Sequence, residues 1–445
     1  MKSSATNFKT FFSGKKVTVM GLGLLGRGVG DVAFLASLGA KLTVTDRKTK
    51  KELASSVKLL SKYKNIKFVL GEHREKDFTS ADMVIKAAGV PLNSPYIAAA
   101  KKAGVPVYMS TALFAQFAKE KGATLVGITG TRGKSTTTHL IAHILKTAGK
   151  KVHLGGNVRG VATLQQIKNV QMDDVCVLEL DSWQLQGFDD LKVSLDVSVF
   201  TSFMQDHLNY YSSMDLYFKD KAGIYRNQTN EGVLVAGKTA AALIKKDFKN
   251  VHGHFIAVSA KDTPASWKRN LLGEHNDENI AAAAAAVRAL GLSESVIKKG
   301  VATFAPVEGR LQMLRAVRGV SIVNDNNGTT PDATVAALKA MQKQGKIVLI
   351  LGGSNKGISF KALISEIKKR KAILVLLPGT GTDQFKMEWK GGYVEVPSMD
   401  EAVKVAFGIA KRGDTVLLSP ACASFGLFVN EYDRNDQFVK AVRRL

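Results

Sequence analysis

Short runs of β-branched and other apolar residues alternate with longer segments of helical composition along almost the whole chain. The alternation falls into three blocks, which open with the strand-like runs KVTVMG, ATLVGITG and SIVNDN. Parallel strands need a crossover connection between them, so this alternation predicts parallel sheets covered by helices. We therefore expect an α/β fold with three domains, separated where proline and glycine interrupt the pattern. The expected domains are 1–112, 113–307 and 308–445.

The composition is that of an ordinary globular protein. With 445 residues, of which 45% are hydrophobic, the chain can bury several cores. No run is long enough to span a membrane, and the first residues lack the apolar core of a signal peptide, so we expect no membrane insertion. The only cysteines, Cys176 and Cys422, lie inside or just after apolar runs. This indicates reduced, packed thiols and a cytoplasmic protein.

The formal net charge of +25 would attract nucleic acid, anionic lipid or phosphorylated small molecules without distinguishing among them. The lysines are scattered, as in 48–51 and 368–371, and lack the interleaved aromatic residues of a groove for single strands. We interpret most of them as solvated helix faces and expect no required nucleic acid.

A glycine-rich turn follows the first strand-like run. Gly21, Gly23 and Gly26 form GxGxxG, and Asp46 ends the next run, as in a dinucleotide-binding fingerprint. Glycines let the backbone approach a diphosphate, and the carboxylate can bind a hydroxyl group. Such a turn could therefore bind a UDP-sugar as well as NAD. The alternative is a tight turn without a ligand.

The second block opens with a phosphate loop. The segment 127–136, GITGTRGKST, follows a strand-like run and precedes a helical segment. Its backbone N–H groups can point at phosphate, Lys134 adds a positive charge, and Ser135 and Thr136 offer hydroxyl groups to magnesium. The spacing departs from GxxxxGK[ST], since Ile128 stands five residues before Gly133. We still expect an ATP-type site here rather than a glycine turn beside a chance lysine.

Polar residues also follow the next strands of this block. Glu179 closes the run DVCVLEL, where a carboxylate could complete a magnesium site, although a surface carboxylate at a strand end is the alternative. His207 follows Asp206 near the next strand end and could act as a ligand or hydrogen-bond donor. His139 and His143 lack the glutamate of an HExxH zinc motif, so we expect packing or surface roles for them.

Several segments match one known family in the same order along the chain. TGTRGKSTTTHL and ELDSWQLQ resemble sequences of the Mur ligases, and the second is similar to a signature of their D-glutamate-adding branch. The further matches are GGN at 155–157, DHLNYY at 206–211, GEHNDEN at 273–279, NDNNGTTPDAT at 324–334 and SPACAS at 419–424. The resemblance implies a Rossmann-like N-terminal domain, a P-loop ATPase-like central domain and a Rossmann-like C-terminal domain.

The resemblance also implies a reaction. Mur ligases use ATP to turn a substrate carboxylate into an acyl phosphate, which the nitrogen of an amino acid then attacks. Such chemistry depends on charge neutralisation and alignment more than on a protein nucleophile. For this chain it implies addition of D-glutamate to UDP-N-acetylmuramoyl-L-alanine in peptidoglycan precursor synthesis. The resemblance further implies a cytoplasmic monomer that uses ATP and Mg²⁺ and has two metal sites.

Matching the family's motifs residue by residue implies the following roles. The catalytic residues would be Lys134, Glu179, His207 and Lys221. ATP would be bound by Gly130, Thr131, Arg132, Gly133, Lys134, Ser135, Thr136, Asn279, Arg310 and Asp325. The UDP-sugar would be bound by Leu24, Leu25, Asp46, Arg47, Gly89, Asn157 and His207. The amino acid would be bound by Thr330, Lys356 and Ser424. The metal ions would be held by Ser135, Thr136, Glu179, His207 and Lys221 in the form of a carbamate.

Lys221 enters this set only through the resemblance. A carbamate would change its cation into an anion that attracts magnesium. Without the resemblance, an exposed helix lysine would be the preferred interpretation.

The chain departs from the family pattern at four positions, most of them in the third block. Glu431 stands where a phenylalanine is frequent, Asn327 and Gly309 replace a lysine and a histidine, and an acidic residue is missing near Ala112. These departures concern the identity of the amino acid more than the fold or the use of ATP. The alternatives are a Mur-type or folylpolyglutamate-like ligase for another amino acid, a nucleotide-binding switch protein, and an NAD oxidoreductase.

Overall fold

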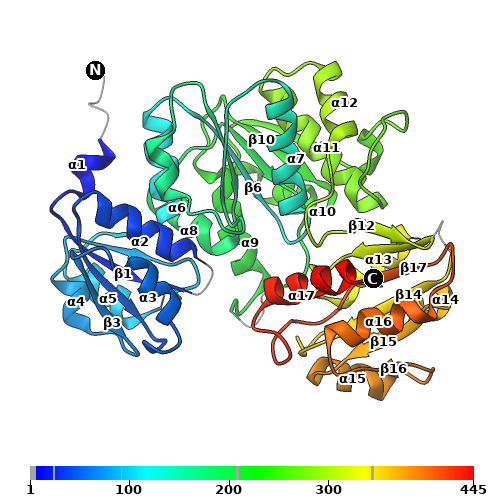
Figure 1. The fold of residues 1–445 in the computed structure, drawn as a ribbon. Helices are drawn as coiled ribbons and strands as arrows, with labels where there is room; N and C mark the ends of the chain where they lie inside the picture. Colours follow the sequence, from blue (N-terminus) through cyan, green and yellow to red (C-terminus); the bar gives the residue numbers. More distant parts are fainter. Residues whose placement is uncertain (1–6, 24–25, 92, 207–209, 342–344) are drawn as a thin grey trace. The chain divides into compact units, whose positions relative to one another are not determined.

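The computed structural model describes residues 7–445 apart from 24–25, 92, 207–209 and 342–344, and for 248–250 it describes the backbone alone. The described residues form three sheets, each built from one of the predicted blocks (Figure 1). The chain divides into two compact units. The first unit comprises 1–263 and 278–300 and holds two sheets, and the second comprises 264–277 and 301–445 and holds the third.

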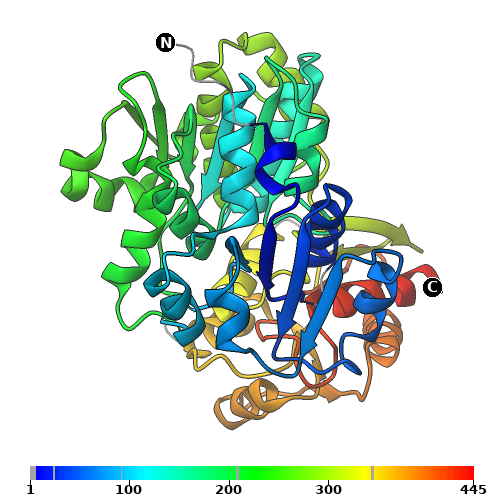
Figure 2. The ribbon, with the colours of Figure 1, turned by 90° about the vertical axis from the view of Figure 1, so that its left-hand side faces the viewer.

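The first sheet has five parallel strands in the order β3-β2-β1-β4-β5 (Figure 2). Its two faces pack against different helices, because side chains alternate along each strand. Val17 and Val19 join a cluster with Leu35 of α2, whereas Met20 joins a cluster with Phe78 of α4. The elements are α1 (Phe8–Phe12), β1 (Lys16–Met20), α2 (Arg27–Ser37), β2 (Lys41–Asp46), α3 (Ala54–Leu60), β3 (Ile66–Leu70), α4 (Glu75–Thr79), β4 (Met83–Lys86), α5 (Pro95–Lys102) and β5 (Val107–Tyr108).

The second sheet has six parallel strands in the order β11-β10-β9-β6-β8-β7. The alanine-rich helix expected from the sequence is α11, whose residues 280–287 are all buried, since small side chains allow close packing. The strands are β6 (Thr124–Thr129), β7 (Val152–Gly156), β8 (Val175–Glu179), β9 (Val197–Phe200), β10 (Val233–Gly237) and β11 (His254–Val258). The helices are α6 (Ser110–Glu120), α7 (Lys134–Thr147), η1 (Leu164–Lys168), α8 (Ser182–Asp190), α9 (Met214–Arg226), α10 (Lys238–Ile244), η2 (Lys245–Asn250), η3 (Ala260–Asp262), α11 (Glu274–Ala289) and α12 (Glu294–Thr303).

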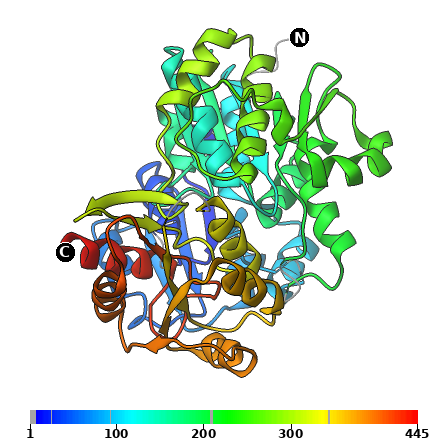
Figure 3. The ribbon, with the colours of Figure 1, turned by 90° about the vertical axis from the view of Figure 1, so that its right-hand side faces the viewer.

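The third sheet, drawn in yellow to red in Figure 3, has the order β12-β13-β17-β14-β15-β16. One face packs against α13 and α14, and the other against α16 and α17, so this sheet is also covered on both sides. The strands are β12 (Gln312–Val317), β13 (Val320–Asn324), β14 (Ile347–Gly352), β15 (Ile373–Leu377), β16 (Val394–Glu395) and β17 (Thr415–Leu418). The helices are α13 (Pro331–Ala340), α14 (Lys361–Arg370), α15 (Thr380–Glu388), α16 (Met399–Ile409) and α17 (Glu431–Arg443).

Strand β12 was not expected from the sequence. It runs antiparallel to β13, and the two-residue turn between them has positive φ at both Arg318 (48°) and Gly319 (80°). Such a turn matches the twist of a β-hairpin. None of the six residues of β12 is fully buried, because the strand lies at the edge of the sheet, so the sequence shows little alternation of apolar and polar residues there.

The predicted α/β class is confirmed, with three sheets in the predicted order along the chain. The predicted boundary at residue 112 falls inside α6, and the one at 307 falls between α12 and β12. The domain boundaries themselves stay predictions.

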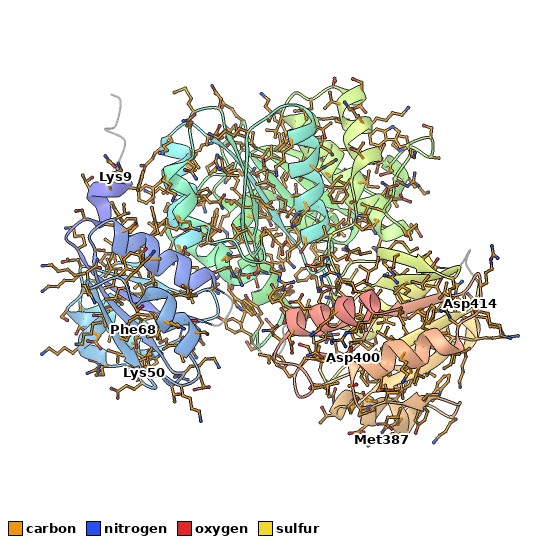
Figure 4. All side chains as sticks on the ribbon, viewed as in Figure 1. Lys9, Lys50, Phe68, Met387, Asp400 and Asp414 are labelled. Atoms are coloured by element: carbon orange, nitrogen blue, oxygen red, sulfur yellow. The ribbon has the colours of Figure 1, made fainter. Side chains whose placement is uncertain are left out.

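The lysines interpreted as solvated helix faces are exposed, but 48–51 lie between β2 and α3, so only those at 368 and 369 lie on a helix. Residues 48, 50, 51, 368, 369 and 371 are exposed lysines. Figure 4 draws the side chains on the ribbon and labels Lys50 among them. Among the described residues, no helix combines the length and apolar character needed to cross a bilayer.

Candidate active site

The turn between β6 and α7 is the predicted phosphate loop. Helix α7 begins at Lys134, directly after Gly133, whose φ of 87° lies in the left-handed region. A Cβ atom on Gly133 would lie 2.3 Å from Oδ1 of Asn279, and one on Gly130 would lie 2.1 Å from Oγ1 of Thr201. Both positions therefore require glycine. Within the described residues no side chain caps α7, and a helix N-terminus of this kind favours an anion.

The loop is held against the chain that follows β9. The backbone N–H of Thr131 donates to the carbonyl of Ser202 at 2.8 Å, and that of Arg132 donates to Oγ of Ser202 at 2.9 Å. The hydroxyl of Thr131 accepts from the backbone N–H of Met204 at 3.1 Å. These bonds fix the shape of the loop, so Thr131 and Arg132 have structural partners in addition to the ATP role predicted for them.

Two lysines meet at the carbonyl of Gly130. Nζ of Lys134 donates to this oxygen at 2.9 Å, and Nζ of Lys221, from α9, donates to it at 3.0 Å. Lys221 is only 1% exposed, and the ring of Tyr217 lies 4.8 Å from its Nζ. The pKa of Lys221 lies well below its usual value, mainly because the side chain is buried and also because the positive charge of Lys134 lies close to it. Lys221 is therefore not the exposed helix lysine that composition alone would favour.

Glu179 ends β8, beside β6, and is 3% exposed. Among the described residues no side chain or backbone group bonds to its carboxylate. A buried carboxylate without compensation is costly, so a cation is expected beside it. Ser135 and Thr136 begin the helix that follows the neighbouring strand, and their hydroxyl groups are donors that suit Mg²⁺. These three residues fit a metal ion.

No cluster of three or more histidine, cysteine, aspartate or glutamate side chains gathers at one point among the described residues. A metal site beside Glu179 would therefore depend on hydroxyl groups, on Lys221 as a carbamate and on oxygen atoms of the nucleotide. His207, Leu24 and Leu25 were also predicted to belong to the site, and they lie outside the described residues.

Asn157 follows β7 and lies next to the end of β8. Its backbone N–H donates to the carbonyl of Glu179 at 2.7 Å. A Cβ atom on Gly156 would lie 2.0 Å from that same oxygen, so the GGN turn can pack here only with glycine. Oδ1 of Asn157 accepts a hydrogen bond of 2.6 Å from Nη1 of Arg27, the first residue of α2. The glycine-rich turn of the first sheet and the edge of the second sheet are thus in contact.

Asp46 braces that glycine-rich turn. Its Oδ2 accepts from the backbone N–H groups of Leu22 at 2.9 Å and Gly23 at 3.2 Å. The carboxylate therefore satisfies two groups of the turn in addition to any ligand. Arg47 beside it is exposed, and the position of a Cβ on Gly89, after β4, is open space. Both remain accessible to the UDP-sugar predicted for them.

In the second unit, the predicted nucleotide residues Asp325 and Arg310 come together. Asp325 follows β13, and its carboxylate accepts from Oγ of Ser419 at 2.8 Å and from the backbone N–H of Leu311 at 3.3 Å. Burial raises the pKa of Asp325 to about 7, and these hydrogen bonds and the charge of Arg310 oppose the shift.

The residues predicted to bind the amino acid follow three adjacent strands of the third sheet. Thr330 precedes α13, Lys356 follows β14, and Ser424 follows β17. Nζ of Lys356 donates to Oγ1 of Thr329 at 3.1 Å, and the backbone before Ser424 pairs with that of Ser354. The order β13-β17-β14 therefore places all three at one carboxyl edge.

Asn279 lies in the first unit, on α11, where it is 7% exposed and lies against Gly133 of the phosphate loop. Oγ1 of Thr137 donates to its Oδ1 at 3.5 Å. The structure thus brings Asn279 to the loop itself.

Three family models match the chain in sequence order. They are the MurD-like N-terminal domain of Mur ligases at 15–109, the Mur ligase middle domain at 128–270 and the Mur ligase glutamate ligase domain at 309–422. UDP-N-acetylmuramoylalanine–D-glutamate ligase from Roseiflexus sp. (strain RS-1) is 34% identical, over 97% of this chain and 98% of that protein. The chain belongs to the Mur ligase family. The protein of the same name from Clostridioides difficile (strain 630) is also 34% identical, over 97% and 99% of the two chains.

Solved structures show the Mur ligase fold as well. UDP-N-acetylmuramate-alanine ligase from Thermotoga maritima is similar with a TM-score of 0.61 at 21% identity, covering 97% of this chain and 99% of that one. The MurF ligase from Thermotoga maritima in complex with ADP gives a TM-score of 0.58 at 17% identity, covering 90% and 95%.

Sequence reasoning about this Mur ligase missed Arg434. This side chain of α17 is fully buried, and it donates to Oδ1 and the carbonyl of Asn326 at 2.8 and 2.9 Å and to the carbonyl of Cys422 at 3.1 Å. It thereby joins the loops after β13 and β17, which carry Asp325 and Ser424. The signal was its place four residues before the buried Phe438, on the apolar face of the helix.

Glu431, where the family frequently has phenylalanine, is the first residue of α17. A carboxylate in the first turn stabilises a helix N-terminus. Its carbonyl also accepts from Nδ2 of Asn326 at 2.9 Å. Glu431 therefore has a structural role in this Mur ligase, at the start of α17.

A cavity of about 370 Å³ lies on the first sheet but at the opposite edge from the motifs. Lys16, Lys41 and Ile66, which begin β1, β2 and β3, help to line it, and no predicted site residue does. Concavity alone would therefore misplace the site in this Mur ligase. The rule that ligands bind at the carboxyl ends of parallel strands places it where the motifs lie.

Proposed function

We propose that the chain catalyses the ATP-dependent addition of D-glutamate to UDP-N-acetylmuramoyl-L-alanine. The observation that carries this proposal is similarity along the whole length to curated proteins of that name, with 34% identity over 97% of the chain. Such similarity spans the UDP-sugar, nucleotide and amino-acid regions together, whereas a shared ATP site alone would leave the substrates open.

We assign ATP to the loop between β6 and α7. The N-terminus of α7 and Nζ of Lys134 supply positive charge where β- and γ-phosphates would lie. A solved enzyme of the same fold, the MurF ligase from Thermotoga maritima, is in complex with ADP, which supports the use of an adenine nucleotide. Asn279 then approaches the nucleotide from α11, and Asp325 and Arg310 keep the nucleotide role that the resemblance implies for them.

We assign Mg²⁺ to Ser135, Thr136 and Glu179, with His207 and Lys221 at a second site. When bound, the ions neutralise charge on the phosphate oxygens. Glu179 supports this assignment because its buried carboxylate has no bonding partner among the described residues. A divalent cation would compensate its charge.

Lys221 is suited to become a carbamate. A neutral amine attacks the carbon of CO₂, one N–C bond forms and one proton is released, which leaves an anion in place of a cation. The lowered pKa of Lys221 favours the neutral amine that this step requires. A carbamate would also turn the repulsion between Lys221 and Lys134 into attraction.

The reaction then needs two displacements. The carboxylate oxygen of UDP-N-acetylmuramoyl-L-alanine attacks the γ-phosphorus, the bond to ADP breaks, and an acyl phosphate forms. The amine of D-glutamate attacks the acyl carbon, phosphate leaves, and the nitrogen loses a proton as the amide forms. Lys134 stabilises the charge that builds on the transferred phosphoryl group. Lys356, Thr330 and Ser424 would orient D-glutamate by its carboxylates.

The proposal includes a cytoplasmic monomer. Burial raises the pKa of both Cys176 and Cys422 to about 12, which keeps these free thiols unreactive and suits a reducing compartment. All of the assigned residues come from one chain, so the chemistry requires neither a second copy nor a nucleic acid.

Phosphate release from ATP tests the proposal directly. The purified protein would receive UDP-N-acetylmuramoyl-L-alanine and Mg²⁺, together with D-glutamate, L-glutamate, L-lysine, D-aspartate or no amino acid. We expect release only with D-glutamate. Release with another amino acid would keep the ligase and overturn the specificity, whereas release without any amino acid would favour a nucleotide switch.

A further inference from the structure

Arg27 is a cation at the carboxyl edge of the first sheet that the proposed chemistry does not use. We propose that Arg27 binds the diphosphate of the UDP-sugar. It would provide a positive charge for phosphate at the edge of the first sheet, as Lys134 does at the edge of the second. This inference rests on the proposed function, because it takes the UDP-sugar as the ligand of the glycine-rich turn.

The two residues occupy the same place in equivalent turns. Arg27 and Lys134 are each the first residue of a helix that follows a parallel strand. Each follows a left-handed glycine, with φ 80° and ψ −19° at Gly26 and φ 87° and ψ −18° at Gly133. In both turns the glycine is therefore followed by a basic residue at a helix N-terminus, which is a position that favours phosphate.

The backbone at Arg27 is fixed by close packing. A Cβ atom on Gly28 would lie 2.2 Å from the carbonyl of Leu22, so α2 packs tightly on its own turn. A Cβ atom on Gly30 would lie 2.3 Å from Cβ of Ala162, so the same helix also packs tightly on the segment that follows Asn157. The backbone of Arg27 is therefore preorganised at this edge, so binding a ligand would not have to order it.

The guanidinium retains capacity for an anion. Its Nη1 donates to the neutral amide oxygen Oδ1 of Asn157 at 2.6 Å. This bond uses one of five N–H donors and leaves the positive charge without neutralising it. The planar fork suits paired oxygen atoms of phosphate. Asn157 is itself predicted to contact the UDP-sugar, so the bond points Arg27 toward the proposed ligand.

The charge balance of the turn also calls for a cation. Asp46 places a carboxylate on the N–H groups of Leu22 and Gly23, so a diphosphate bound at α2 would approach an existing negative charge. A second carboxylate, Asp31, stands four residues after Arg27 on the same helix. Arg27 offsets this repulsion.

Binding of UDP and of uridine separates a phosphate contact from a structural one. We would measure both dissociation constants, by calorimetry for UDP and by NMR titration for uridine, in the wild type and in Arg27→Gln. Glutamine can still donate to Asn157 but carries no charge. We expect UDP to bind about 10- to 100-fold more weakly, the range for a lost hydrogen bond to a charged group, and uridine to bind unchanged.

Lys41→Gln is the charge control, because Lys41 is exposed and begins β2, at the opposite edge of the same sheet. It should leave both constants unchanged. Arg27→Lys keeps the charge and should retain most of the UDP affinity, and it also serves if Arg27→Gln fails to fold.

Equal UDP affinity in Arg27→Gln and wild type would overturn the inference and leave the proposed function intact. Equal loss of UDP and uridine would also overturn it, since the residue would then only shape the turn. Failure of the wild type to bind any uridine compound would instead overturn the proposed function.

Discussion

The glycine-rich turn after β1 and the phosphate loop after β6 both end on a left-handed glycine before a basic first helical residue, but the charges around them differ. In the first, the carboxylate of Asp46 accepts from two N–H groups of the turn. In the second, the corresponding bonds go to neutral groups of Ser202, and Lys221 is buried beside Lys134 against the loop carbonyl. One turn thus combines a cation with an anion, and the other brings two lysines together.

On the assignments proposed above, the glycine turn and helix N-terminus favour phosphate as a class, whereas the surrounding side chains favour a particular charge and chemistry. A turn braced by a carboxylate suits a diphosphate that is held but not broken. A turn with two cations, or one cation and a carbamate with metal, suits the transfer of a phosphoryl group, whose charge must be stabilised as it moves.

The largest expected effect comes from removing the cation of the second turn. Lys134→Met should lower kcat by about 1,000-fold, the upper range for loss of a group that stabilises a transition state. Steady-state phosphate release would measure it. Lys146→Met, in the last turn of the same helix and exposed, is the control. A loss confined to the KM for ATP would contradict the comparison, because Lys134 would then only bind ground-state nucleotide.

Lys221→Ala should reduce turnover by about 100-fold, because it removes the group that would carry the carbamate. Added formate should restore part of the rate, since a small carboxylate can occupy the space and supply oxygen atoms. The rate with and without formate measures this. Chloride at equal ionic strength is the control, and equal restoration by chloride would show that Lys221 has no carboxylate-like role.

Glycine-to-alanine changes should lower the free energy of unfolding by different amounts in the two turns, because the neighbouring atoms differ. Both Gly26→Ala and Gly133→Ala incur backbone strain of about 1–2 kcal/mol at positive φ. The new Cβ meets open space at Gly26 but lies 2.3 Å from Oδ1 of Asn279 at Gly133. We expect Gly133→Ala to cost about 1 kcal/mol more in the free energy of unfolding of the first unit. Urea denaturation compares them, and equal costs would show that Asn279 moves aside freely.

The smallest effect concerns the residue four positions into each helix. Burial raises the pKa of Asp31 in α2 to about 6, while the Ser110 hydrogen bond and the charge of Arg27 oppose the shift. The folded-state pKa therefore exceeds the unfolded-state value, and this contribution to stability is complete below about pH 4 and lost as the pH rises through 6. The equivalent residue in α7 is Thr138, buried and uncharged.

Between pH 5 and pH 7, wild-type stability should fall by about 1 kcal/mol more than that of Asp31→Asn. Urea titrations at both pH values measure the difference. Thr138→Ser is the control in the second turn and should show the wild-type pH dependence. Parallel curves for wild type and Asp31→Asn would mean that Asp31 titrates alike in the folded and unfolded chain.

Much of this arrangement could be predicted from the sequence, because strands, glycine turns and helix starts are local signals. The phosphate loop, Glu179 at a strand end and Asp46 after the second strand were all placed on the correct edges. Parallel topology then gathers such residues without any knowledge of side-chain contacts.

What the sequence could not predict depends on contacts between distant segments. Lys221 is a lysine in a polar helix until the fold buries it at the loop, and Arg434 looks like a surface residue of α17 until it bonds to Asn326. The partner of Arg27 is Asn157, which belongs to another sheet. Strand β12 was missed because an edge strand with few buried residues shows little alternation.

The contact between Gly30 and Ala162 has a consequence for how such chains can evolve. A side chain at position 30 would require the space that the methyl group of Ala162 already fills. Residues at these two positions cannot enlarge independently, so in an alignment of related sequences they should covary, with a larger residue at one matched by glycine at the other. Independent variation at the two positions would mean that the helix can shift between lineages, and that the geometry of Arg27 shifts with it.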